Sequence, residues 1–251
     1  MTSLKNKVAL ITGSARGIGR EIAERYASAG ANIVINYSRN KEAAEETLKN
    51  ITTRYTVDAI AIQADVSKVD EVERLFSDAK AHFGSIDIVV VNAGVEVIDL
   101  PMVDVTEEQY DRLFDINAKG AFFTMQFAAK SVSDNGRIIY IGSTTTRYPL
   151  PGIALYGGSK TSPMYLVQVL AIELGKKGIT VNGIIPTAID GAGVFTKAGD
   201  NADMRRFVEN NVPMGRMGTA SDVADVAEFF ASNLSSFVSG QNLAITGGAL
   251  A

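Results

Sequence analysis

Short apolar runs rich in β-branched residues alternate with amphipathic stretches along almost the whole 251-residue chain. The runs that predict strands are VALIT (8–12), NIVINY (32–37), DAIAIQAD (58–65), IDIVVVNAG (86–94), RIIYIGS (137–143) and ITVNGIIP (179–186). The stretches between them predict helices over about 18–28, 41–54 and 66–84, from about 106, and over about 154–175. Strands that are apolar on both faces and separated by helices are typical of a parallel sheet with helices on both faces. Because such crossovers are right-handed, we predict a doubly wound α/β fold.

The chain shows no sign of a second domain. It has no internal repeat, no block of like charges and no linker, so residues 1–251 predict one domain. The segment 187–220 differs from the rest, because it is rich in glycine and polar residues and long for a connection. We expect it to be a substrate lid whose residues 190–212 are mobile until substrate binds, with hinge-tolerant residues in GAGV (191–194) and KAGDN (197–201).

The composition excludes several kinds of chemistry. The chain has no cysteine, which rules out disulfides, thiolate metal ligands and a cysteine nucleophile. His82 is the only histidine, and it stands at the expected end of a surface helix, which leaves a Ser-His-Asp triad without a suitable base. The formal net charge of -4 gives no basic footprint for nucleic acid or an anionic membrane. We therefore expect no metal site, no nucleic-acid partner and no membrane partner.

The N-terminus and the hydropathy favour a soluble protein. The apolar run in MTSLKNKVALITG is too short for a signal peptide. No window approaches the roughly 18 apolar residues of a membrane span. Hydrophobic residues make up 46% of the chain and charged residues 21%, which is ordinary for a globular protein with a sizeable core. We expect a cytoplasmic location.

A glycine-rich turn, TGSARGIG (12–19), lies between the first expected strand and the first expected helix. Gly13, Gly17 and Gly19 permit a sharp turn, close approach of the backbone and tight helix–strand packing. The helix that follows presents unpaired N–H groups, which suit a pyrophosphate. The spacing is G-x3-G-x-G rather than G-x-G-x-x-G, and a glycine-rich turn alone is weak evidence for a nucleotide site. The strand before it and the helix after it strengthen that interpretation.

Two further groups follow strands at the edge of the sheet where ligands bind in open α/β folds. Asp65 ends the third strand, where a carboxylate could accept a hydrogen bond from an adenine amino group or could cap the helix that follows. Asn92, Ala93 and Gly94 end the fourth strand, and the small residues among them would let the backbone approach a ligand.

The stretch YGGSK (156–160) places Tyr156 and Lys160 four residues apart, on one face of a helix. The two glycines between them are poor helix formers, each costing roughly 1 kcal/mol relative to alanine. A plain turn would explain the glycines. They would also fit a helix face that presses closely on a cofactor or a partner helix, with an ammonium that lowers the pKa of the phenol.

Taken in order, these motifs resemble the short-chain dehydrogenase/reductase family in its short, single-domain form. The resemblance runs from about residue 7 to 186 and resumes at SGQNLAITGG (239–248). It implies a Rossmann-type domain that transfers hydride between a nicotinamide and a carbonyl or alcohol. The family's catalytic tetrad corresponds here to Asn117, Ser143, Tyr156 and Lys160.

The resemblance also implies a role for each member of this tetrad. Tyr156 would be the acid–base group, and Lys160 would lower its pKa and hold the nicotinamide ribose. Ser143 would bind the substrate oxygen, and Asn117 would hold a water that links Lys160 to solvent. Structural alternatives remain, because Ser143 could simply end a strand and Asn117 could be a buried polar group at a helix bend.

The same resemblance, together with the second strand, defines the expected cofactor site. An acidic residue at the end of that strand would favour NAD(H), but the chain reads INYSRN there and has no Asp or Glu until Glu42. Arg16 and Arg39 lie within reach of a 2′-phosphate, unless both are ordinary solvated residues. We therefore predict NADP(H), discriminated at Asn36. The expected cofactor-binding residues are Gly13, Ser14, Arg16, Gly17, Ile18, Gly19, Asn36, Tyr37, Ser38, Arg39, Asp65, Val66, Asn92, Ala93, Gly94, Tyr156, Lys160, Pro186, Thr187 and Ile189.

The favoured function is an NADPH-dependent carbonyl reductase that acts reversibly on a ketone or aldehyde. The alternative within the family is a 3-oxoacyl-carrier-protein reductase, for which Lys130 and Arg137 offer only a thin basic patch beside Asp134. The length and glycine spacing disfavour a sugar epimerase, and the complete tetrad disfavours a nucleotide sensor without catalysis. The expected pocket suits a small or medium neutral carbonyl compound, and its lining residues are Val95, Glu96, Thr144, Thr145, Leu150, Thr187 and the lid 187–212.

One residue departs from the family pattern. Pro163 follows in SKTSPM, inside the expected helix, where a proline removes a backbone hydrogen bond and clashes one turn earlier. We therefore expect a bend or a lost hydrogen bond near 159–163. In this family the same helix often forms a dimer interface within a tetramer, so the resemblance implies a homotetramer.

Overall fold

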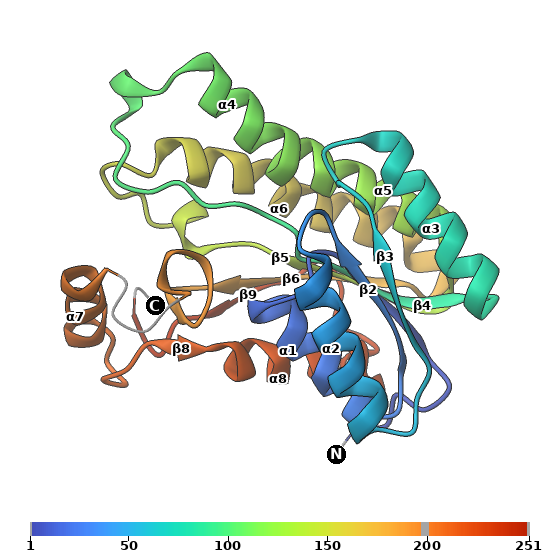
Figure 1. The fold of residues 1–251 in the computed structure, drawn as a ribbon. Helices are drawn as coiled ribbons and strands as arrows, with labels where there is room; N and C mark the ends of the chain where they lie inside the picture. The colour runs from blue at the N-terminus through green and yellow to red at the C-terminus, as the bar shows by residue number, and fades with distance from the viewer. Residues whose placement is uncertain (1, 197–200, 250–251) are drawn as a thin grey trace.

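Seven strands form the central sheet in the computed structural model, which describes residues 2–196 and 201–249 (Figure 1). Their order is β3-β2-β1-β4-β5-β6-β9, and neighbours are parallel throughout. The strands are β1 (Val8–Ile11), β2 (Asn32–Tyr37), β3 (Ala59–Gln63), β4 (Ile86–Val91), β5 (Val132–Ile141), β6 (Thr180–Pro186) and β9 (Asn242–Ile245). The order reverses between β1 and β4, so the predicted doubly wound sheet is confirmed. Ligands bind beside such a reversal, at the carboxyl ends of the strands.

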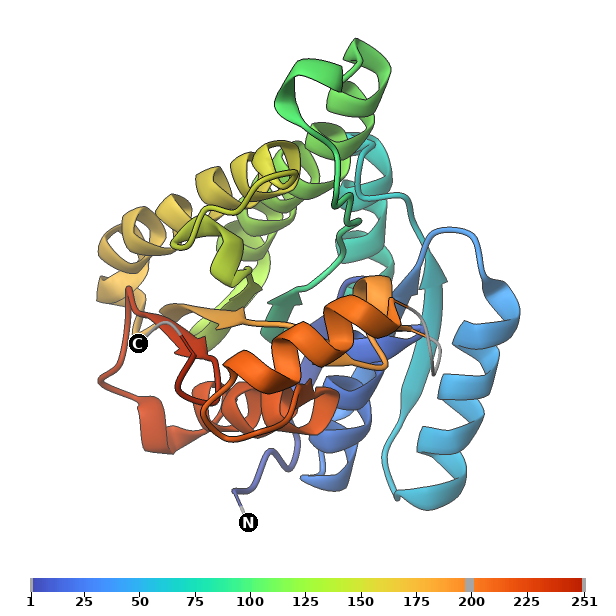
Figure 2. The ribbon, with the colours of Figure 1, turned by 90° about the vertical axis from the view of Figure 1, so that its left-hand side faces the viewer.

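Helices cover both faces of this sheet (Figures 1 and 2). One face carries α1 (Gly17–Ser28), α2 (Lys41–Arg54) and α8 (Ala220–Ala231). The other carries α3 (Val69–Phe83), α5 (Ala121–Ser131) and α6 (Ala154–Leu174). Two shorter helices, α4 (Glu107–Phe114) and α7 (Ala202–Asn211), and a small parallel pair, β7 (Ile189–Asp190) with β8 (Gly218–Thr219), complete the main elements. Within the described ranges no helix is long and apolar enough to cross a membrane.

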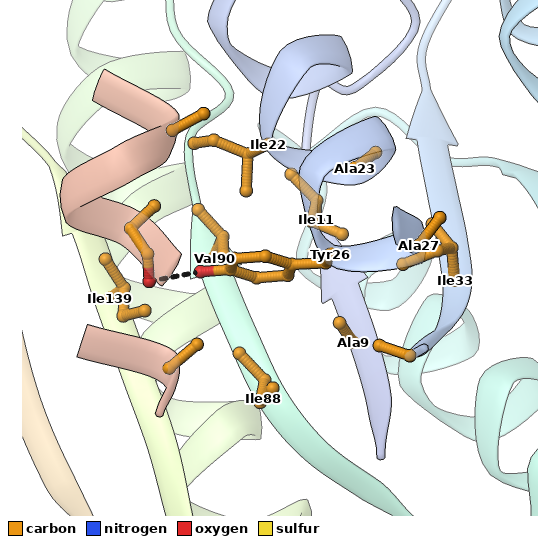
Figure 3. Close-up of a cluster of buried hydrophobic side chains, with 14 of the residues drawn as sticks. Ala9, Ile11, Ile22, Ala23, Tyr26, Ala27, Ile33, Ile88, Val90 and Ile139 are labelled. Atoms are coloured by element: carbon orange, nitrogen blue, oxygen red, sulfur yellow. Dashed lines mark hydrogen bonds between the residues drawn. The ribbon is translucent and has the colours of Figure 1, made fainter. Parts of the chain in front are cut away.

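The packing on the first face explains why the amphipathic pattern of residues 18–28 folds as it does. Ile22 and Tyr26 project from α1 onto Ile11 of β1 and Val90 of β4, and all four side chains are fully buried (Figure 3). The Tyr26 hydroxyl donates a 2.8 Å hydrogen bond to the carbonyl of Ala227 in α8. This contact satisfies a buried polar group and joins the first and last helices of that layer.

Strand β5 starts earlier than predicted, and helix α6 contains the proline that was expected to disturb it. Strand β5 begins at Val132, five residues earlier than the apolar run indicates, because Val132 pairs with Ile86 before a register shift that Asn135 in a left-handed conformation accommodates. Helix α6 runs without a break from Ala154 to Leu174 although Pro163 lies inside it. Pro163 has no N–H to donate to the carbonyl of Ser159, so one backbone hydrogen bond is missing there, and the predicted bend stays a prediction.

Candidate functional site

A cleft of about 1040 Å³ lies at the carboxyl ends of the strands. It brings together the glycine-rich turn after β1, the ends of β2, β3 and β4, helix α6 and the segment after β6. All the residues predicted to bind cofactor line this cleft except Ser14, whose hydroxyl is buried and donates to the carbonyl of Ile11. Of the predicted tetrad, Ser143, Tyr156 and Lys160 line the cleft, whereas Asn117 lies behind its wall. Residues far apart in sequence therefore share one site.

The glycine-rich turn fits a dinucleotide pyrophosphate. A Cβ on Gly13 would lie 2.9 Å from Cα of Ala93, and one on Gly19 would lie 2.6 Å from Nδ2 of Asn92. Both glycines are therefore needed for close packing of the turn on the end of β4. Gly17 has φ +58° and starts α1, whose N-cap residue Arg16 makes no side-chain capping bond. The first turn of α1 consequently keeps N–H groups available to an anion.

Thr12, which the sequence prediction did not include, and Asn92, which it did, hold this turn against β4. Thr12 Oγ1 accepts hydrogen bonds from the backbone N–H groups of Asn92 and Ala93, each at 3.0 Å. The side-chain amide of Asn92 in turn donates to the carbonyls of Thr12 at 2.8 Å and Gly13 at 3.2 Å. The position of Thr12, directly before the first glycine, was the available signal for its role. Together these bonds fix the two strand ends that a cofactor would touch.

Asn36 is placed differently from what the sequence suggested. Its side chain is 1% exposed, Oδ1 accepts from the N–H of Gly13 at 3.0 Å, and Nδ2 donates to the carbonyl of Ala64 at 3.0 Å. Both ends of the amide are therefore used by backbone groups of neighbouring strands. Asn36 is suited to shaping the glycine-rich turn rather than to reading the cofactor's ribose, and an Asn36→Asp change would disturb the turn itself.

The residues after Asn36 form the exposed surface at the end of β2. Tyr37 is partly exposed, and Ser38 and Arg39 are exposed at the rim of the cleft. Arg16 is also exposed and lines the same cleft. This part of the cleft thus carries two guanidinium groups, and Glu42 is exposed within the first turn of α2.

Asp65 stabilises the turn before α3 without being its N-cap, and its contact with an adenine stays a prediction. Its Oδ1 accepts from the N–H of Ser67 at 3.0 Å and from the Ser67 hydroxyl at 2.8 Å, which stabilises the turn before α3. The residue also lines the cleft, together with Val66. The N-cap of α3 itself is Lys68.

Tyr156 lies in the first turn of α6 and Lys160 in the second, and both line the cleft. Two residues of β5 hold the ammonium of Lys160: Nζ donates to the carbonyl of Ile141 at 3.1 Å and lies 5.5 Å from the centre of the Tyr140 ring. The side chain is only 4% exposed. Ser143, just beyond β5, accepts hydrogen bonds from the N–H and hydroxyl of Thr145, at 3.3 and 2.9 Å.

The protonation of this pair is governed by burial. Burial raises the pKa of the Tyr156 phenol, the nearby Glu96 carboxylate raises it further, and a hydrogen bond with Ser143 lowers it. Burial also lowers the pKa of Lys160 to about 8, against the attraction of Glu96. The expected lowering of the Tyr156 pKa by Lys160 is not found. The phenol is therefore held in its protonated form.

The two glycines between Tyr156 and Lys160 have different surroundings. A Cβ on Gly157 would lie 3.0 Å from the carbonyl oxygen of Thr145, so the helix presses on the turn at 144–146. A Cβ on Gly158 would meet only the Phe114 ring at an ordinary 3.7 Å. Close approach explains Gly157, and the contact is with this turn rather than with a cofactor or a partner helix.

Asn117 lies in a π-helical turn, Asp115–Gly120, between α4 and α5. Its side chain is buried, with Oδ1 accepting from the N–H of Val95 and Nδ2 donating to the Val95 carbonyl, both at 2.8 Å. Nδ2 also donates to the hydroxyl of Ser159 at 3.0 Å. The side chain thus ties the loop after β4 to α6. A carboxamide, with one acceptor and one donor end, is the side chain that such a clamp requires.

The expected substrate pocket adjoins these groups. Val95, Glu96, Thr144, Thr145, Leu150 and Thr187 all line the cleft, joined by Phe195 and by Met204, Phe207 and Val208 of the α7 segment. The predicted lid therefore borders the cleft, although residues 197–200 of its second hinge lie outside the described residues.

Comparisons with known proteins agree with this geometry. Residues 13–249 match the family described as Enoyl-(Acyl carrier protein) reductase. The chain is 40% identical to a probable tetrahydroxynaphthalene reductase of Zymoseptoria tritici, over 98% of this chain and 95% of that one. A short chain dehydrogenase of Burkholderia cenocepacia, solved in complex with NADP, superimposes with a TM-score of 0.91 at 33% identity, covering 99% of each chain. A promiscuous reductase that catalyses keto-reduction in lugdunomycin biosynthesis superimposes with a TM-score of 0.91 at 36% identity, covering 100% of each chain. The glycine-rich turn, the Tyr156–Lys160 pair and these relatives together establish that the chain belongs to the short-chain dehydrogenase/reductase family.

Proposed function

We propose that the protein is an NADPH-dependent reductase of ketones or aldehydes. The observation that carries this proposal is that Tyr156 and Lys160 line the same cleft as a glycine-rich turn suited to a dinucleotide. The names of a tetrahydroxynaphthalene reductase and of a keto-reducing enzyme among the relatives support a carbonyl substrate. A reduced nicotinamide, when bound, would supply the hydride.

The residues of the chain then handle the proton and the developing charge. As hydride reaches the carbonyl carbon, the oxygen becomes negative, and the protonated phenol of Tyr156 donates its proton to that oxygen. Ser143, beside the phenol, would hydrogen-bond the same oxygen. Lys160, which is kept near the phenol by the carbonyl of Ile141, would hold the nicotinamide ribose and offset the charge left on Tyr156. One hydride and one proton are added, and the product is an alcohol.

The preference for NADP(H) rests on the rim of the cleft. Arg16 and Arg39 are exposed there, and a planar guanidinium can bind a 2′-phosphate through two hydrogen bonds. The Burkholderia relative, named as an NADP complex, points the same way. Asn36 does not enter this argument, because its amide is buried and already bonded.

A 3-oxoacyl-carrier-protein reductase is less well supported. Its expected docking patch used Lys130 and Arg137, but Arg137 is only 6% exposed and donates to the carbonyls of Asn135 and Gly136. Of these two basic residues, only Lys130 is exposed for docking.

We also propose that the segment 187–220 closes over the substrate and that the chain assembles as a homotetramer. For the assembly, α6 exposes large apolar side chains, with Tyr165 65% and Ile172 84% exposed. Sedimentation of the purified protein would test the oligomeric state, with a monomer at micromolar concentration contradicting it.

The activity is tested with purified protein and a panel of aldehydes, ketones, diketones and a 3-oxoacyl thioester. Each compound is assayed with NADPH and with NADH by loss of the reduced-nicotinamide absorbance. We expect turnover of at least one ketone or aldehyde, and at least a tenfold higher specificity constant with NADPH, about 1.4 kcal/mol. Oxidation of neither nicotinamide with any carbonyl compound would contradict the proposal.

A further inference from the structure

The carboxylate of Glu96 lines the cleft beside the acid–base pair. Its Oε2 accepts a hydrogen bond from the backbone N–H of Val194, at 3.1 Å. The carboxylate is close enough to Tyr156 and Lys160 to raise the pKa of both. Glu96 therefore belongs to the wall of the reaction chamber rather than to the surface.

The backbone holds this carboxylate from two sides. Val95, the preceding residue, is fixed through its N–H and its carbonyl by the side chain of Asn117. On the other side, a Cβ on Gly193 would lie 2.3 Å from Oε2, and Gly193 has φ +56°. The turn Gly193–Phe195 can therefore approach the carboxylate closely only because residue 193 is glycine. The position of the carboxylate is thus set by the fold.

A partly buried carboxylate at this place works against carbonyl reduction. Burial disfavours its charge, as the raised pKa of Glu96 shows. Its charge also repels the negative charge that develops on the substrate oxygen during hydride transfer. Among the described residues, the N–H of Val194 is the sole hydrogen-bond donor to it, and no lysine or arginine forms an ion pair with it. An ionised carboxylate can accept about four hydrogen bonds, so acceptor capacity remains toward the cleft.

We propose that Glu96 is a specificity-determining residue: it accepts a hydrogen bond from a hydroxyl group of the substrate and excludes anionic carbonyl compounds. The proposal rests on the proposed carbonyl reductase activity and names its substrate class, which is neutral carbonyl compounds that carry a hydroxyl group. A hydroxyl satisfies the remaining acceptor capacity of the carboxylate. A substrate carboxylate or phosphate would instead place two negative charges in one partly buried chamber.

The test uses acetophenones that carry a hydroxyl, a methoxyl or a carboxylate group at the ortho, meta or para position. The three positions sample the unknown distance between Glu96 and the reacting carbonyl. For the wild type, we expect the best hydroxyl isomer to have a kcat/KM about tenfold above its methoxyl counterpart, and at least as far above the carboxylate, since a hydrogen bond to a charged acceptor is a strong one.

The Glu96→Gln variant separates recognition from architecture. Its amide oxygen can still accept from Val194, while its amide nitrogen donates instead of accepting. We expect the hydroxyl-to-methoxyl ratio to fall to about threefold or less and the carboxylate compound to gain about fivefold or more in kcat/KM. The matched control Glu108→Gln makes the same chemical change on the exposed face of α4 and should leave all ratios unchanged.

The outcomes are distinct. Reduction of ketones with no preference for hydroxyl groups, or wild-type ratios in Glu96→Gln, would overturn this inference and leave the reductase activity standing. A purely architectural role of Glu96 in holding Val194 gives that second result. No oxidation of either nicotinamide with any carbonyl compound would overturn both proposals. The Tm and the NADPH affinity of each variant, measured by nicotinamide fluorescence, show whether it is folded.

Discussion

The side-chain amide of Asn117 binds both backbone polar groups of Val95, accepting from its N–H and donating to its carbonyl, each at 2.8 Å. The two residues lie 22 positions apart, in the π-helical turn after α4 and in the loop after β4. This clamp also reaches α6 through Ser159, three residues after Tyr156 and one before Lys160. Asn117 therefore joins the loop after β4 to the helix that carries the proposed acid–base pair.

Replacing Asn117 with aspartate should break half of this clamp. The carboxylate can still accept from the N–H of Val95 but cannot donate to the Val95 carbonyl or to Ser159. Leaving buried groups unsatisfied costs about 1–3 kcal/mol, and we expect a lower Tm together with at least a tenfold loss of kcat/KM. Denaturant titration and steady-state kinetics measure the two effects. Asn233→Asp, on the exposed surface, should change neither, and an Asn117→Asp enzyme with wild-type stability would contradict the clamp.

Tyr156→Phe keeps the ring and its packing but removes the proton that the carbonyl oxygen needs. We expect turnover to fall roughly 10²–10⁴-fold, the range for loss of a general acid, with nearly unchanged NADPH affinity. Single-turnover absorbance and nicotinamide fluorescence separate chemistry from binding. Turnover within threefold of the wild type would remove Tyr156 from the acid–base role.

The buried ammonium of Lys160 predicts a pH dependence of stability. Its pKa is lowered by burial from 10.5 to about 8, so between these pH values the unfolded chain binds more protons than the folded one. The free energy of unfolding should therefore rise with pH in this window, by roughly 1 kcal/mol per pH unit. Denaturant titrations of the wild type and Lys160→Met at pH 7.5, 8.5 and 9.5 should show a difference in stability that grows with pH. A difference independent of pH would contradict the burial of an ionisable group.

Buried tyrosines limit the pH range in which this effect of Lys160 can be measured. Burial raises the pKa values of Tyr26, Tyr140 and Tyr156, so these phenols stay protonated in the folded state while those of the unfolded chain ionise. Stability should fall with rising pH above about 10, which has the opposite sign to the effect of Lys160. Measurements below pH 10 therefore isolate the lysine.

The rim arginines predict the cofactor preference. Arg39→Ala should weaken NADPH binding about tenfold or more and leave NADH binding nearly unchanged, because only NADPH carries the 2′-phosphate. Arg16→Ala should act in the same direction. Arg54→Ala, at the other end of α2, is the control. Equal losses for the two dinucleotides in the Arg39 variant would show that its guanidinium does not bind the phosphate.

Helix α7 is expected to be the mobile part of the lid. It contains no fully buried residue, although Met204, Phe207 and Val208 face the cleft. Few buried contacts mean a low free energy of local opening. Amide hydrogen exchange over 202–211 should be fast without ligands and slower with NADPH and the alcohol product. Equal protection in both states would show that this helix does not close over the substrate.

The sequence alone determined six of the seven strands of the sheet, the glycine-rich turn and the pairing of Tyr156 with Lys160 on one helix face, but not β9. These features follow from local patterns: apolar runs of strand length, glycines at fixed spacing and a Tyr–Lys pair one helical turn apart. The doubly wound arrangement follows as well, because such crossovers are right-handed, whereas the order of the strands comes from the structure. The family resemblance then placed Ser143 in the same cleft, where the structure has it.

The tertiary structure decided how the remaining polar groups are used. Asn36 was predicted to discriminate between the cofactors at the end of β2, yet its side chain is buried because β3 and the glycine-rich turn close over it. Arg137 likewise loses its predicted docking role because it is buried. Glu96 lines the cleft as predicted, but only the structure shows its hydrogen bond from Val194. The burial and the hydrogen-bond partners of a side chain depend on residues 20 to 100 positions away. Glu96, for example, accepts its hydrogen bond from Val194. A local sequence pattern cannot predict such contacts, because they form only when the sheet brings distant loops together.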